Sequence, residues 1–348
     1  MPRNPLLALL LFLAALIVGG CKPKDATSGD SPGTSAPAQG RAVAQQLTAA
    51  QAKARQRPDD VAAQMTLARL AYESGAFNDA YRAYRQSASI DSSNYEAMLG
   101  LARTNLKLQN PTEGLDWLLR AKRLKPQDPE LKELEARLLL VNGNFDRAIE
   151  CFQTATRANP DRITTWLNLA SAYALMNRTA EAVATARQAV KISPDDPAPH
   201  FALGRHLQRA RDNAGAEAEY RKALELDQNH AGTMVALARL LMEQNRRLDE
   251  ARQLAIKASI IQTDRADAAV IAAWILHLQG DDRKAANELI KLVNASPQNP
   301  EAWQKLSVVL NRIGKPEEAK QAAEMAQRFI PGRRAAADLQ LLDTQTSR

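Results

Sequence analysis

Small and apolar residues recur along the chain at a fixed spacing. The clearest row consists of small residues 34 positions apart, with one step of 35: Ala80, Gly114, Ala148, Ala182, Ala216, Ala251, Ala285 and Ala319. Further rows of mostly small residues run in phase with it. Small residues let two helices approach closely, and a period of this length indicates stacked supersecondary units. The pattern predicts an all-α protein built from repeats.

Proline marks most of the boundaries between these repeats. The proline row consists of Pro58, Pro126, Pro160, Pro194, Pro297 and Pro331. Proline ends one helix and suits the turn before the next, so each unit should contain complete helices.

The repeat resembles the tetratricopeptide repeat, a helix–turn–helix unit of the same length. One unit carries the family's large, small, aromatic and proline residues at Trp166, Leu169, Ala170, Tyr173, Ala182, Ala189 and Pro194. Ala186 departs from the pattern, because the family usually has a bulky residue there. Scored in this way, eight units cover about residues 61–331. The resemblance implies an α-solenoid superhelix of about eight helix–turn–helix units with helical caps.

Two features of the units concern their turns. Gly75, Gly143, Gly280 and Gly314 fall where the two helices of a unit meet. That position favours a left-handed backbone, which glycine adopts readily. The sixth unit has one extra residue near Asn245 to Leu248, and we expect the turn between its helices to absorb it.

The start of the chain resembles a bacterial lipoprotein signal. Arg3 precedes an apolar run from Leu6 to Val18, which is shorter than the about 20 residues that a spanning helix needs. The run leads into Gly19-Gly20-Cys21, which is similar to the lipobox of that family. The resemblance implies a cleaved signal peptide at residues 1–20 and an acylated Cys21. An uncleaved anchor is the alternative.

The resemblance also bears on location. Lys22 stands where the commonest signal for inner-membrane retention has aspartate. We therefore expect a lipid-anchored protein of the bacterial envelope, in the outer membrane and facing the periplasm.

The composition of the segments outside the repeats predicts a linker and two caps. Residues 21–40 include the lipidated cysteine and otherwise lack large apolar side chains, which predicts a flexible linker. Residues 41–60 are polar and alanine-rich and predict an N-terminal capping helix, and residues 332–348 predict a C-terminal capping helix and tail.

Charge limits the classes of partner. The formal net charge is +7 at pH 7, a modest excess for 348 residues. It suits acidic partners or an anionic surface. No dense Lys/Arg block with interleaved aromatics is present, so nucleic-acid binding is not expected.

Catalytic motifs are not apparent. His200, His206, His230 and His277 fall in different phases of the repeat and have no partner at metal-ligand spacing. Cys151 is left alone once Cys21 is acylated, so no internal disulfide is available. The sequence predicts no enzyme activity, no cofactor and no metal site.

Binding residues are suggested by the family resemblance. In this family the second, fifth, ninth, twelfth and thirteenth positions of each first helix face the concave side. In the seventh unit these positions include Trp274 and His277. Exposed tryptophan is a common hot spot for binding. Packing of Trp274 against a neighbouring helix is the alternative.

The ninth position carries arginine in five units. These residues are Arg69, Arg103, Arg137, Arg205 and Arg239, and Ser171 interrupts the row. Three of them have a glutamate four residues away on the same helix, at Glu73, Glu133 and Glu243. That spacing brings opposite charges together.

The other two arginines have a cation at that distance. Lys107 follows Arg103 and Arg209 follows Arg205, without a compensating carboxylate on the same helix. We expect these two pairs to hold carboxylates of a partner. The lysine and asparagine of the family's clamp for chaperone C-termini are absent.

These features predict a non-enzymatic scaffold or assembly factor that binds segments of envelope proteins in a concave groove. A component of an exopolysaccharide export or secretion system that binds an anionic polysaccharide is the alternative. A protein partner predicts a localised patch with an apolar anchor, whereas a polymer predicts a continuous basic track. The sequence does not identify the partner.

Overall fold

The computed structural model describes residues 38–263 and 265–329. These residues form seventeen helices, and no strand occurs among them. The predicted signal peptide, Cys21 and the cap at 332–348 lie outside the described residues. No helix in the described part of the chain combines the length and apolar character needed to cross a bilayer.

The chain divides into two compact units between Arg178 and Thr179, at the turn inside the fourth repeat. The N-terminal unit contains α2 (Ala38–Gln56), α3 (Val61–Glu73), α4 (Phe77–Ile90), α5 (Tyr95–Lys107), α6 (Pro111–Leu124), α7 (Pro129–Val141), α8 (Phe145–Ala158) and α9 (Ile163–Leu175). The C-terminal unit contains α10 (Thr179–Ile192), α11 (Pro197–Arg209), α12 (Asn213–Leu226), α13 (Ala231–Glu243), α14 (Leu248–Ile261), α15 (Ala266–Leu278), α16 (Asp282–Ala295), α17 (Pro300–Arg312) and α18 (Pro316–Arg328).

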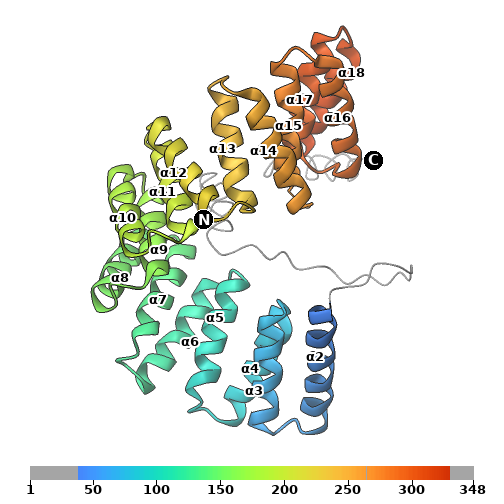
Figure 1. Ribbon diagram of the computed structural model, residues 1–348. Helices are drawn as coiled ribbons and strands as arrows, with labels where there is room; N and C mark the ends of the chain where they lie inside the picture. The colour runs from blue at the N-terminus through green and yellow to red at the C-terminus, as the bar shows by residue number, and fades with distance from the viewer. Residues whose placement is uncertain (1–37, 264, 330–348) are drawn as a thin grey trace, which may run out of the picture. The chain divides into compact units, whose positions relative to one another are not determined.

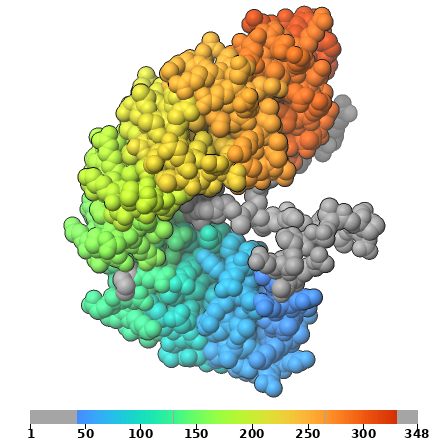
Figure 2. Space-filling model, viewed as in Figure 1, coloured from blue at the N-terminus to red at the C-terminus, as the bar shows by residue number. Residues whose placement is uncertain are grey.

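Each unit is a stack of helices in chain order (Figure 1). Within a unit every helix packs against the next one in sequence. The first helices of successive repeats also contact one another, α3 with α5, α5 with α7 and α7 with α9 in one unit, and α11 with α13, α13 with α15 and α15 with α17 in the other. Side chains fill the space between the helices (Figure 2). The predicted solenoid of tetratricopeptide-like repeats is therefore confirmed within each unit.

Side-chain caps explain where the first helices begin. Asp60, Asn94, Asp128, Asp196 and Asn299 each accept a hydrogen bond from a backbone N–H in the first turn of the helix that follows. Such caps satisfy donors that the helix itself leaves without partners. Proline is the first residue of α7, α11 and α17, where its missing N–H costs nothing. α2 begins at Ala38, inside the predicted linker, and packs against α3.

The core uses the rows found in the sequence. Large side chains on the second helices are buried, at Tyr84, Leu118, Phe152, Tyr220 and Leu289. The first-helix leucines Leu101, Leu169, Leu203, Leu237 and Leu306 are buried too, whereas Leu67 is half-buried. The alanines of the clearest row are buried among them, from Ala80 to Ala319. Each repeat thus buries its apolar side chains by stacking on its neighbours.

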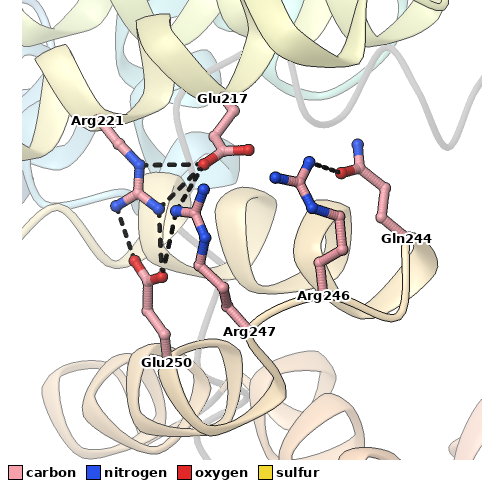
Figure 3. Close-up of polar contacts among 6 residues, drawn as sticks. All are labelled: Glu217, Arg221, Gln244, Arg246, Arg247 and Glu250. Carbon is pink, nitrogen blue, oxygen red and sulfur yellow. Dashed lines mark hydrogen bonds and ion pairs between the residues drawn. The ribbon is translucent and has the colours of Figure 1, made fainter.

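The extra residue of the sixth repeat lies in the turn between α13 and α14, as expected. Asn245 and Arg247 both have positive φ, at 51° and 45°, and α14 begins at the next residue. The Arg247 side chain is held by two glutamates (Figure 3). One is Glu217 of α12, with Nη1 2.9 Å from Oε1, and the other is Glu250 of α14, with Nη1 3.6 Å from Oε2.

Arg221 of α12 binds the same two glutamates. Its Nη1 lies 2.7 Å from Oε1 of Glu250, and its Nη2 lies 3.1 Å from Oε1 of Glu217. Arg246 bonds Gln244 instead and takes no part in this cluster (Figure 3). The extra residue therefore joins two second helices by charge-assisted hydrogen bonds.

Candidate partner-binding surface

The candidate surface in each unit consists of the second, fifth, ninth, twelfth and thirteenth residues of the first helices, which we call the first-helix face. The first helices of each unit contact one another in sequence order, so these positions lie on adjacent elements. The N-terminal unit contributes α3, α5, α7 and α9, and the C-terminal unit contributes α11, α13, α15 and α17.

In the N-terminal unit, Arg103 has a carboxylate partner from the next repeat. Its Nε donates to Oε1 of Glu130 over 3.0 Å, and Nη2 bonds the same oxygen. Glu96 on the same helix acts on Arg103 only at a distance, and it is the adjacent first helix that supplies the bonded carboxylate. Binding of a partner's carboxylate by Arg103 stays a prediction, and such a carboxylate would have to compete with Glu130.

Tyr72 lies in the same electrostatic environment. Burial raises the pKa of its hydroxyl, while the positive charges of Arg137 and Arg103 act to lower it. The Tyr72 ring also packs edge-on against Phe77, with ring centroids 5.5 Å apart. The twelfth and ninth positions of neighbouring repeats therefore form one polar and aromatic patch.

The same-helix pairs expected for three arginines do not form in the described residues. Glu133 instead forms an ion pair with Arg162, whose Nε lies 3.0 Å from Oε2, and accepts a hydrogen bond from the hydroxyl of Thr165 at 3.1 Å. Glu243 accepts from Gln208 at 3.4 Å. No ion pair joins Arg69 to Glu73 within the described part of the chain. Glu133 and Glu243 therefore bond to residues of neighbouring repeats and not to the arginines four residues away on their own helices.

Lys107 and Arg209, the second members of the two proposed cation pairs, both make interactions of their own. Arg205 lies over the ring of Phe201, with its Cζ 5.8 Å from the centroid. Beside it, His206 is buried, and burial together with Arg205 and Arg209 lowers its pKa to about 4. These residues are embedded in local contacts and do not form an open pair of free cations.

In the C-terminal unit, Trp274 is partly buried and packs against the core formed by α15 to α18. The Nζ atom of Lys305, on α17, lies 3.9 Å from the centroid of the indole ring. The ring of His277 lies 4.4 Å from it, centroid to centroid. Trp274 therefore both packs and contributes to the surface, and the two sequence interpretations are not exclusive.

Arg239 bonds across two repeats. Its Nη1 lies 3.5 Å from Oε1 of Glu301, so the ion pair links α13 to α17 past the intervening α15. Burial lowers the pKa of Lys305, Glu301 acts to raise it and Arg239 acts to lower it. Arg239, Trp274, Glu301 and Lys305 thus form one group of side chains, the Trp274 cluster.

The His277 side chain is hydrogen-bonded to a residue of the second helix α16. Its Nδ1 contacts Oδ1 of Asp282, and the other oxygen of Asp282 lies 3.2 Å from Nε of Arg312. Beside these residues two large apolar side chains remain exposed, Leu278 at 39% and Val308 at 46%. Val308 occupies the ninth position, where most repeats carry arginine.

Glu130, Glu301 and Lys305 were missed from the sequence, although a signal was present. Both glutamates occupy the second position of a first helix, which the family resemblance places on the concave side. The ninth position of one repeat pairs with the second position of a later repeat, so a search for opposite charges across repeats would have found them.

The structure offers no assembled ligand set for a metal. Within residues 38–263 and 265–329 no three His, Cys, Asp or Glu side chains gather in a way that could hold an ion. His200 is held between the carboxylate of Glu219, 2.6 Å from Nδ1, and the carbonyl of Pro194, 2.9 Å from Nε2. His230 caps α13. Cys151 is half-buried, and burial raises the pKa of its thiol.

Comparisons with known proteins agree with this architecture. Family models described as tetratricopeptide repeat match residues 71–138, 134–197 and 201–270. The structure is similar to that of yeast Tom70, with a TM-score of 0.64 and 17% identity over 95% of this chain and 72% of the other. At that identity the likeness concerns the fold alone.

Two curated relatives match part of the chain. Protein O-mannosyl-transferase TMTC3 of Homo sapiens is 26% identical, and the match covers 51% of this chain and 17% of that protein. Cellulose synthase operon protein C of Xanthomonas axonopodis pv. citri (strain 306) is 32% identical, and the match covers 50% of this chain and 12% of that protein. The chain therefore spans less than a fifth of the length of either relative.

Proposed function

The chain belongs to the tetratricopeptide repeat family, and on that premise we propose that it is a non-enzymatic scaffold that binds segments of partner proteins on its first-helix faces. The observation that carries the proposal is the C-terminal first-helix face. There, exposed Leu278 and Val308 lie on the same helices as the partly buried Trp274 and Lys305. Tryptophan and arginine are enriched among binding hot spots, and the side chains around such residues contribute mainly by excluding water.

A scaffold without catalysis agrees with the roles of the histidines. His200, His230 and His277 are engaged in contacts with neighbouring side chains or backbone groups, and His206 is buried between arginines. The transferase name of the human relative describes a protein of which this chain matches 17%. A match over that share of the relative gives no reason to assign the transfer reaction here.

We place this scaffold in the bacterial envelope, attached through a lipid on Cys21 to the outer membrane and facing the periplasm. The support is the sequence before the repeats, in which a short apolar run ends at Gly19-Gly20-Cys21. Replacing Cys21 with serine should block lipid transfer and signal cleavage, so the precursor accumulates. Processing and distribution like those of the wild type would contradict the anchor.

The second candidate function is binding of an anionic polysaccharide. The partial match to a cellulose synthase operon protein supports it, over 12% of the length of that protein. A polymer needs a continuous basic track, however, and the arginine row is broken by Ser171 and by the ion pairs of Arg103 and Arg239. A localised protein-binding patch suits the described surface better.

Crosslinking in intact envelopes, followed by identification of whatever is captured on the tagged full chain, tests the scaffold. The proposal expects one or a few envelope proteins in stoichiometric amounts. Recovery of polysaccharide without protein would favour the second candidate instead.

A further inference from the structure

The charged groups of the Trp274 cluster are paired with one another or with its aromatic ring. The ion pair between Arg239 and Glu301 connects α13 to α17, and the ammonium group of Lys305 lies on the indole of Trp274. Glu301 and Lys305 are four residues apart on α17, so they lie on the same side of that helix. A carboxylate of the chain itself therefore already pairs with Arg239 and acts electrostatically on Lys305, whose ammonium group lies on the aromatic ring.

The ion pair between Arg239 and Glu301 is weak enough for another carboxylate to replace Glu301. The Arg239 and Glu301 side chains are 34% and 40% exposed, and their atoms are 3.5 Å apart. Such partly exposed pairs contribute little, because water screens them and ordering two long side chains costs entropy. Burial also disfavours the charged form of Lys305. A further carboxylate would stabilise that cation as Glu301 does.

Apolar surface continues beyond these charges. Leu278 lies four residues after Trp274 on α15, and Val308 lies three residues after Lys305 on α17. Both are exposed, and both helices contact each other. The surface thus combines an exchangeable carboxylate site, formed by α13 and α17, with an apolar strip on α15 and α17.

We propose that the Trp274 cluster binds an acidic peptide segment of a partner protein, one carboxylate of which displaces Glu301 from Arg239. An apolar side chain of the same segment packs against Trp274, Leu278 and Val308. Charge complementarity supports this occupant, because Arg239, Lys305 and the 64% exposed Arg312 supply cations around the strip. The inference rests on the proposed scaffold function and specifies the class of peptide segment that the scaffold binds. Glu301 acts as an internal competitor for the site.

Fluorescence anisotropy with a defined probe tests the proposal. The probe is a fluorescein-labelled peptide with one leucine among glutamates and serines, added to the full chain. Glu301→Gln removes the competitor, so binding should tighten by about two- to fivefold, the range expected for a partly exposed ion pair. Arg239→Glu and Trp274→Ala should each weaken it. A probe with glutamine in place of glutamate should lose the response to Glu301→Gln.

Glu288→Gln is the matched control, because Glu288 lies on the second helix α16 in an exposed pair with Lys291. It removes the same charge from the same unit. Equal tightening by both glutamine variants would show a general charge effect and overturn the displacement. Weaker binding by Glu301→Gln would overturn it as well. Circular dichroism checks that each variant is folded. If Trp274→Ala unfolds, the Arg239 and Glu301 variants alone test whether the peptide displaces Glu301.

The outcome is separable from that of the scaffold proposal. If envelope crosslinking captures a protein equally well with Arg239→Glu and Glu301→Gln, the scaffold stands and this site is wrong. If the probe behaves as expected but no envelope protein is captured, the site stands and the scaffold is wrong. Displacement of the probe by alginate, lost in Arg239→Glu, would assign the site to a polysaccharide and overturn the peptide.

Discussion

Two glycines on first helices make room for tyrosines of the second helices. A Cβ atom at Gly100 would lie 2.5 Å from the ring of Tyr84, and one at Gly204 would lie 2.6 Å from the ring of Tyr220. Other repeats have alanine at the position of Gly204, as in Ala170 and Ala238. Gly204 therefore leaves room for the Tyr220 ring as that ring lies in this repeat, and no positive φ is involved.

Gly204→Ala should destabilise the protein by about 1–3 kcal/mol, because the buried Tyr220 ring has little room to move. Urea unfolding measures the effect. Gly232→Ala is the control, since the atoms nearest to its Cβ would be side-chain atoms of His230, Arg265 and Phe201, at 3.3, 3.5 and 3.7 Å. It should be neutral or slightly stabilising. Equal midpoints for the two variants would show that the contact with Tyr220 is not tight.

His206 should make stability depend on pH. Burial, Arg205 and Arg209 lower its pKa from 6.5 to about 4 in the folded chain. The unfolded chain takes up a proton at higher pH than the folded chain, so stability present above pH 6.5 is lost as pH falls towards 4. The loss is on the order of 3 kcal/mol for a shift of this size.

His206→Gln removes this titration while keeping a polar side chain of similar length. The free energy of unfolding should fall less steeply for the variant than for the wild type between pH 6.5 and 4. Denaturant titrations at several pH values give the two curves. Parallel curves would mean that His206 stays solvated or is protonated in the folded state.

At the scale of helices, the extra residue of the sixth repeat changes what its turn does. Arg247 adopts a left-handed conformation just before α14 and binds Glu217 of α12. Glu217 is buried, accepts hydrogen bonds from Arg221 and forms an ion pair with Arg247. The turn is therefore tied to the preceding repeat as well as to its own helices.

Glu217→Ala should cost about 1–3 kcal/mol, because two arginines lose a hydrogen-bonded partner that is largely shielded from water. Glu225→Ala is the control, since Glu225 belongs to an exposed pair with Lys222 on the same helix. Its effect should stay below about 0.5 kcal/mol. Thermal unfolding compares them, and similar small shifts would show that the cluster does not stabilise the sixth repeat.

The repeat phase predicted the helices, the buried rows and the turn that absorbs the extra residue. It succeeded because Ala148, Phe152 and their equivalents meet the same neighbours in each repeat. The charges on the first-helix face were predicted less well. Arg103 bonds Glu130, 27 positions away, and Arg239 bonds Glu301 across two repeats. The spacing of four residues predicts ion pairs within one helix only. It gives no information about charged side chains on neighbouring helices that compete for the same arginine.

At the scale of the whole molecule, each of the two compact units carries its own first-helix face. Each repeat contacts mainly its neighbours, so stability is spread along the array and binding is set by a few repeats. The C-terminal face carries exposed apolar side chains together with cations that can exchange partners. The function of the chain therefore depends on which segment that face accepts.

Position-specific photocrosslinking in intact envelopes tests that claim most directly. A photoreactive phenylalanine derivative at Val308, on the first helix α17, is compared with one at Ile260, on the second helix α14. Both positions are exposed, at 46% and 71%, and both belong to the C-terminal unit. We expect a discrete protein adduct from Val308 and none from Ile260. An adduct from Ile260 alone would place the partner on the second helices and contradict binding at the first-helix face.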